Sequence, residues 1–91
     1  MVAKNMFEQL GYIQSEKSVS GIQYINKSKD SEMQRIGMVT TKIIEFYPLS
    51  KELLFQTTIK FRDGSTKVSD STVLNFEEFK AVQQQVLELG W

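Results

Sequence analysis

The chain has 91 residues, in which eleven Lys and Arg are balanced by eleven Asp and Glu, and it contains no histidine and no cysteine. This length suits one domain, residues 1–91, with a modest core. The missing cysteines exclude disulfides and thiolate sites, and the missing histidines remove the commonest general base and zinc ligand. A net charge of zero provides no overall field that would attract nucleic acid or an anionic membrane.

The N-terminal segment carries no signal for secretion or membrane insertion. It lacks the apolar stretch of about 7–15 residues that a signal peptide requires. Apolar runs elsewhere are short, such as Leu53-Leu54-Phe55, whereas a spanning helix needs about 20 residues. We therefore expect a soluble cytoplasmic protein without a membrane partner.

The first predicted helix covers residues 3–10 and ends at a glycine followed by an aromatic residue. Gly11-Tyr12 parallels Gly90-Trp91 at the other end of the chain. Glycine takes the left-handed conformation that commonly ends a helix, and the residue after it packs back onto the last turn. We expect Tyr12 to contact Phe7 for this reason.

The middle of the chain has the composition of β-strands. Proline turns the chain at residue 48, because it cannot donate to a strand ladder, and Asp63-Gly64 is a strong signal for a two-residue hairpin. Residues 27–35 are polar and predict a mobile loop. The β-branched and aromatic segments predict strands at residues 19–26, 38–47, 52–62 and 65–69.

The last helix begins after Asn75, which is a favourable N-cap residue. Glu78 stands three positions later, as in a capping box. Apolar residues then recur at spacings of three and four, which predicts one buried stripe. This stripe comprises Phe76, Phe79, Val82, Val86 and Leu89.

The order of these elements predicts an α+β fold. Consecutive strands with short connections form an antiparallel meander of three or four strands, and the two helices pack on one of its faces. Most of the core would come from the alternating third strand and the last helix, namely Leu53, Phe55, Ile59, Phe61, Phe76, Phe79, Val82 and Val86.

Catalysis would have to use carboxylates, and each carboxylate has a structural explanation. Turn, cap and loop positions account for them, so a carboxylate-based enzyme is the weakest alternative. No nucleophile motif, phosphate-binding loop or EF-hand spacing is present. We therefore expect a non-enzyme without a cofactor, a recognisable metal motif or a small-molecule ligand, and a Mg²⁺ or Ca²⁺ site built from carboxylates stays open as an alternative. The acidic groups considered are Asp30, Glu32, Asp63, Asp70, Glu77 and Glu78.

Nucleic-acid binding is the alternative from a different class. Lys60, Arg62 and Lys67 flank the predicted hairpin, and cross-strand pairing would be able to bring them onto one face. The last helix, however, opens with Glu77 and Glu78, where a module that reads duplex RNA would carry lysines.

Protein association is the function that the pattern favours. If the core residues of the third strand face the helices, Leu54 points to the uncovered face, with two of Ile43, Tyr47, Ile25 and Tyr24. An apolar group there is typical of a partner site. We take Ile43, Tyr47 and Leu54 as the candidate interaction face, for another protein or for a second copy.

The two ends of the chain resemble small proteins encoded by phages and prophages of Firmicutes. The resemblance rests on residues 7–12, where the first helix ends in Leu10-Gly11-Tyr12, and on residues 74–82 of the last helix, which ends in Glu88-Leu89-Gly90-Trp91. It implies an origin in a mobile element and a bacterial cytoplasmic setting. It implies no catalytic residues, because most members with this pattern have no assigned activity.

Overall fold

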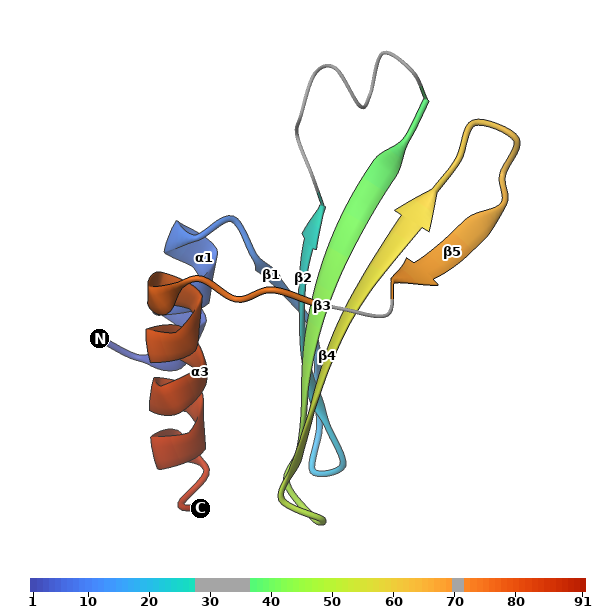
Figure 1. Cartoon of the computed structure of the whole chain (residues 1–91). Coiled ribbons are helices and arrows are strands. Elements are labelled where there is room, and N and C mark those ends of the chain that lie inside the picture. Colours follow the sequence, from blue (N-terminus) through green and yellow to red (C-terminus); the bar gives the residue numbers. More distant parts are fainter. Residues whose placement is uncertain (28–36, 70–71) are drawn as a thin grey trace.

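The computed structural model describes residues 1–27, 37–69 and 72–91. In this part of the chain, helices α1 (Ala3–Gln9) and α3 (Phe76–Glu88) pack beside an antiparallel sheet (Figure 1). The five strands lie in chain order, so the sheet is a meander. They are β1 (Ile13–Lys17), β2 (Ile22–Lys27), β3 (Val39–Tyr47), β4 (Glu52–Lys60) and β5 (Thr66–Ser69).

The predicted α+β class and antiparallel meander are confirmed, but the predicted number of strands is too low. The additional strand is β1, an edge strand with mostly exposed, polar side chains. Its pairing with β2 shifts between Gln14 and Glu16, so Ser15 is an extra residue. Such a bulge interrupts the two-residue alternation by which a strand is recognised in a sequence. The predicted loop at 27–35 lies, apart from Lys27, outside the described residues.

The hairpin between β4 and β5 is one residue longer than predicted. Phe61 N–H donates to the Ser65 carbonyl at 2.9 Å, and Gly64 N–H donates to the Phe61 carbonyl at 3.0 Å. Gly64 has a φ of +89°. A turn followed by a left-handed glycine is the usual three-residue hairpin loop, so residues 62–64 form the loop.

Both helices end as their glycines predict. Gly11 and Gly90 have φ values of +92° and +76°. The next residue in each case donates its N–H back to the helix, from Tyr12 to the Phe7 carbonyl at 2.9 Å and from Trp91 to that of Val86 at 3.3 Å. The Tyr12 and Phe7 rings meet edge to face at 5.4 Å, which confirms the predicted contact.

The helices run antiparallel and are joined at both ends by side chains from α3. Near one end, the Glu88 carboxylate accepts the N–H of Ala3, at the start of α1, at 2.6 Å. This bond supplies a cap to a helix whose own N-cap residue, Val2, has no side-chain acceptor. At the other end, Glu78 accepts the hydroxyl of Tyr12, which follows α1.

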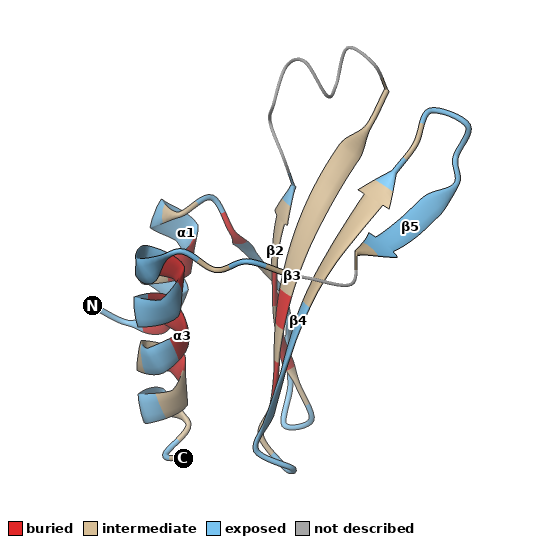
Figure 2. Ribbon diagram, viewed as in Figure 1, coloured by how far each residue is buried: buried red, intermediate tan, exposed pale blue. Residues whose placement is uncertain are grey.

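The core lies between the helices and the middle of the sheet. Phe7 stacks on Tyr24 with ring centroids 4.0 Å apart, and Phe46 meets both rings edge-on. Figure 2 shows the buried positions on the inner sides of the helices and on the facing part of the sheet. The buried apolar residues are Ala3, Phe7, Tyr12, Ile22, Tyr24, Ile44, Phe46, Ala81 and Val82.

The predicted core is wrong in its main members. Val82 is buried and Val86 packs against the core, but Phe76 and Phe79 are 62% and 54% exposed. Leu53 and Phe55 are exposed as well, and Ile59 and Phe61 are only half-buried. The helices lie over β2 and β3. Strand β4 is hydrogen-bonded to β3, but the helices leave its apolar side chains largely uncovered.

Buried hydrogen bonds explain this placement of α3. The hydroxyl of Tyr24, on β2, donates to the Gln85 side chain at 2.7 Å, and Lys42, on β3, binds Glu78 at 3.0 Å. Buried polar groups need such partners, so the residues on α3 that hold them fix its position over β2 and β3. Within the described ranges, no helix is long and apolar enough to cross a membrane.

Candidate interaction surface

The sheet has two faces, and the described helices pack on only one of them. Ile22, Tyr24, Ile44 and Phe46 point toward the helices and are buried. Side chains alternate along a strand, and directly paired residues share a face. The other face, called the open face below, therefore comprises Ile13, Glu16, Gln23, Ile25, Lys27, Val39, Thr41, Ile43, Glu45, Tyr47, Glu52, Leu54, Gln56, Thr58, Lys60, Thr66 and Val68.

An apolar row crosses the middle of the open face. Ile13 pairs with Ile25, which pairs with Ile43, so three isoleucines from three strands lie side by side. Leu54 lies diagonally across from Ile43, because Ile43 pairs with Gln56. Ile13 is 71% exposed and Leu54 37% exposed. Diagonal neighbours in a sheet remain within contact range of long side chains, so the four residues form one continuous surface.

The structure places all three predicted interaction residues on this face. Ile43 and Tyr47 lie on β3 with the same orientation, and Leu54 pairs with Glu45 between them. Tyr47 donates its hydroxyl to the Glu45 carboxylate, which also accepts the Gln23 amide at 2.6 Å. The sequence interpretation missed Ile13, because residues 13–17 lacked the alternation of a strand.

Charged side chains occupy the two ends of the open face. Lys60 lies at one end, opposite Val39, and Lys27 lies in the next row, opposite Thr41. The other end carries Glu16, Glu45 and Glu52. The hydrogen bond to Glu45 raises the pKa of Tyr47, partial burial raises it further, and the charges of these three glutamates add to the effect. The negative charges of Glu16, Glu45 and Glu52 therefore all lie close enough to the Tyr47 hydroxyl to raise its pKa.

The residues of the nucleic-acid alternative do not share a face. Lys67 pairs with Ile59 and points to the helix side, whereas Lys60 pairs with Thr66 and belongs to the open face. Arg62 lies in the hairpin loop, with its side chain against Gly37. The predicted cross-strand cluster of three cations therefore does not form on either face.

Glu78 is held as a structural carboxylate. It is 5% exposed, and it forms the predicted capping box with Asn75 in both directions. The Lys42 ammonium lies 3.0 and 3.1 Å from its two oxygens and donates also to the Val73 carbonyl at 2.7 Å. Burial alone would raise the pKa of Glu78, but the hydrogen bonds from Asn75, Tyr12 and Lys42 outweigh it and hold the pKa below its ordinary value.

The other acidic groups considered as catalytic candidates are also engaged in local structure or lie outside the described residues. Asp63 accepts the Ser65 hydroxyl at 2.6 Å and its N–H at 2.9 Å, and these bonds lower the pKa of Asp63. Glu77 pairs with Lys80 at 3.5 Å. Asp30, Glu32 and Asp70 fall in the ranges that are not described. Among the described residues, no three acidic groups are placed to hold a metal ion.

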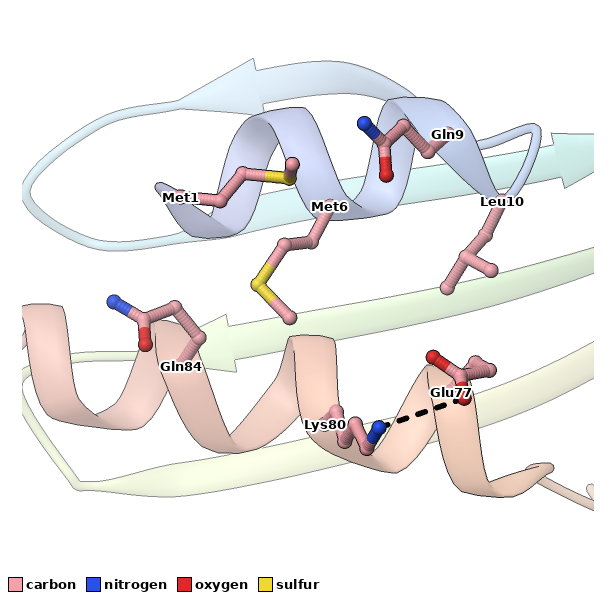
Figure 3. A pocket seen from close by; sticks show the side chains of 7 residues that line it. All are labelled: Met1, Met6, Gln9, Leu10, Glu77, Lys80 and Gln84. Carbon is pink, nitrogen blue, oxygen red and sulfur yellow. Dashed lines mark ion pairs between the residues drawn. The ribbon is translucent and has the colours of Figure 1, made fainter.

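An open pocket of about 410 Å³ lies between α1 and α3. Figure 3 shows Met1, Met6 and Leu10 beside polar groups from both helices, with Lys80 directed toward Glu77. Its two charged side chains thus neutralise each other, and the remaining lining is apolar or amide.

Some residues that the sequence assigned to the core leave apolar side chains exposed on the helix side of the molecule, on β4 and on α3. Leu53 and Phe55 pair with Phe46 and Ile44 and share their face, yet they remain 38% and 36% exposed. On α3, the exposed rings of Phe76 and Phe79 lie 6.5 Å apart, and the Lys80 ammonium sits 4.9 Å from the Phe76 ring centre.

Comparison with known proteins returns no match for this chain, whether against protein-family models, curated proteins or solved structures.

Proposed function

We propose that this chain is a non-enzymatic protein-interaction module that binds its partner through the open face of the sheet. The observation that carries the proposal is the apolar row of Ile13, Ile25 and Ile43, with Leu54 beside it, on a face that no described element covers. Antiparallel sheets with one solvated face normally carry polar residues there. A partner that covers this row would bury its apolar surface, and each Å² of apolar area buried contributes about 25 cal/mol of favourable binding free energy.

The surroundings of the row fit an interface. Protein interfaces combine an apolar centre with a polar rim, and here threonine, glutamine and charged residues surround the isoleucines. An uncovered sheet face is suited to pack against a second sheet or a helix.

The resemblance at the helix ends supports an origin in a phage or prophage of Firmicutes. On this proposal the module acts in the cytoplasm of the bacterial host and binds a host protein or a second copy. The ordered glycine and aromatic endings, Gly11-Tyr12 and Gly90-Trp91, are the residues on which this origin rests.

Capture on the immobilised protein, from a Firmicutes lysate and from a solution of the chain itself, tests the surface. The wild type and a control variant on the exposed side of α3, Gln83→Glu, should retain the same discrete partner. Leu54→Glu and Tyr47→Glu should lose it, since a carboxylate in the contact is desolvated without a counterion. Thermal melts establish that each variant is folded.

Phe79→Glu distinguishes the exposed aromatic pair on α3, Phe76 and Phe79, from the open face. Retention of the partner by this variant is expected. Loss of the partner with Phe79→Glu, together with retention by Leu54→Glu, would place the contact on the helix side and refute the proposal.

A further inference from the structure

The charges of the open face are sorted along the strand direction. The strand ladder divides this face into rows, and Ile43 lies in the middle row. Lys60 and Lys27 lie on one side of this row, and Glu16, Glu45 and Glu52 lie on the other. Lys60 and Glu52 stand opposite Val39 and Tyr47, which are equally far from Ile43 along β3.

This pattern is complementary to itself. A half-turn about an axis that crosses the strands at the Ile43 row exchanges the basic end with the acidic end. Lys60 and Glu52 lie on the same strand, so the half-turn places Lys60 of one copy opposite Glu52 of the other, and the reverse. Lys27 meets the row that holds Glu45 and Glu16.

We propose that the partner of the open face is a second copy of this chain, packed face to face with its strands reversed. The inference rests on the proposed function and names the partner of that surface. Such a contact is isologous, because each patch meets the same patch of the other copy. The row of isoleucines then packs on its own counterpart, with the two sheets about 10 Å apart and their strands aligned within about 30°.

Charge selects this arrangement over the other face-to-face dimer. An axis parallel to the strands would place the basic end of one copy over the basic end of the other, and the acidic end over the acidic end. Like charges at an interface oppose association, whereas complementary charges fix its register. Glu16, Glu45 and Glu52 together concentrate negative charge at the acidic end, which is where a cation from the other copy would be accepted.

Sedimentation equilibrium of charge variants tests the arrangement. Lys60→Glu and Glu52→Lys should each weaken the dimer by about tenfold or more, because each replaces two attractive contacts by two repulsive ones. The double exchange of these two residues should restore the affinity. Lys67→Glu is the matched control, because Lys67 lies on the same hairpin but points to the helix side, and it should leave the dimer unchanged.

Cross-linking supplies an independent geometric test. The chain has no cysteine, so introduced thiols are the only ones present. A short bismaleimide should join a Lys60→Cys chain to a Glu52→Cys chain in a mixture. Lys60→Cys alone should give little product, since the two Lys60 positions lie at opposite ends of the interface. Efficient linking of Lys60→Cys to itself would overturn the reversed arrangement.

The outcomes separate this inference from the proposed function. A wild type that remains monomeric at millimolar concentration overturns the dimer, while loss of a captured host partner with Leu54→Glu would still support the open face as an interaction surface. If the Leu54→Glu variant still dimerises, the dimer does not form through the open face. That result overturns the inference and the assignment of self-association to this face. Single charge variants that dimerise as well as the wild type overturn the reversed arrangement.

Discussion

The hydroxyl of Tyr12 donates a hydrogen bond to the carboxylate of Glu78, which lies 66 positions later in the chain. The bond joins the end of α1 to the start of α3, and Lys42 attaches the same carboxylate to β3 at 3.0 Å. Glu78 therefore connects both helices and the sheet in addition to capping its own helix. The helix cap, the ion pair with Lys42 and the hydrogen bond from Tyr12 all depend on the Glu78 side chain.

Tyr12→Phe should destabilise the protein by about 1–3 kcal/mol, because it leaves a buried carboxylate without one of its donors. Urea unfolding followed by circular dichroism measures the change. Tyr47→Phe is a matched control, since Tyr47 also donates to a glutamate but on the open face. This control should change the free energy of unfolding by less than about 0.5 kcal/mol. Equal losses in both variants would contradict a special role for the Tyr12 contact.

Acid should weaken the protein partly through Glu78. Its pKa in the folded protein lies below the ordinary value of 4.5, so its ionised form contributes stability above about pH 4.5. That contribution is lost as the pH falls through the lowered pKa. Glu78→Gln should start from a lower Tm at pH 7 and lose less on acidification. The measurement is Tm between pH 7 and pH 3, and parallel curves for the two proteins would exclude this linkage.

Two phenylalanines should respond very differently to truncation. Phe46 is fully buried among Phe7, Tyr24 and Trp91, so Phe46→Ala should cost about 3–5 kcal/mol. Phe79 is 54% exposed on α3, so Phe79→Ala should cost less than about 1 kcal/mol. Urea unfolding of both variants under one condition provides the comparison. If Phe79→Ala lowers the free energy of unfolding as much as Phe46→Ala does, Phe79 belongs to the core, as the sequence predicts.

Local chemistry explains which parts of the fold the sequence predicts. Helix ends depend on a few neighbouring residues, so Asn75, Glu78, Gly11 and Gly90 indicate them correctly. The core depends on which strands the helices cover. The clean alternation around Phe55 shows that one side of β4 is apolar. Which strands the helices cover is decided by contacts between residues far apart in the chain, such as the hydrogen bond from Tyr24 to Gln85. Alternation alone therefore predicts that β4 contributes more to the hydrophobic core than it does in the structure.

The candidate surface was predictable in part for the same reason. The opposite orientations of Leu53 and Leu54 follow from the pleat, whatever element packs on the sheet. The register of β2 on β3, which sets Ile25 beside Ile43, involves residues far apart in the chain. The sorting of Lys60 from Glu52 about the Ile43 row also becomes visible only once the register is known.

The turn between β3 and β4 offers a way to stabilise the protein. Lys51 has a φ of +56°, the only positive value at a non-glycine among the described residues. The left-handed conformation costs an L-residue roughly 1–2 kcal/mol, and glycine adopts it freely at an entropic cost of roughly 0.5–1 kcal/mol. Lys51→Gly should therefore raise the free energy of unfolding by up to about 1 kcal/mol in urea titrations. Ser50→Gly, at a neighbouring position without a positive φ, should lower it instead, and a lower value for Lys51→Gly would contradict the strain at Lys51.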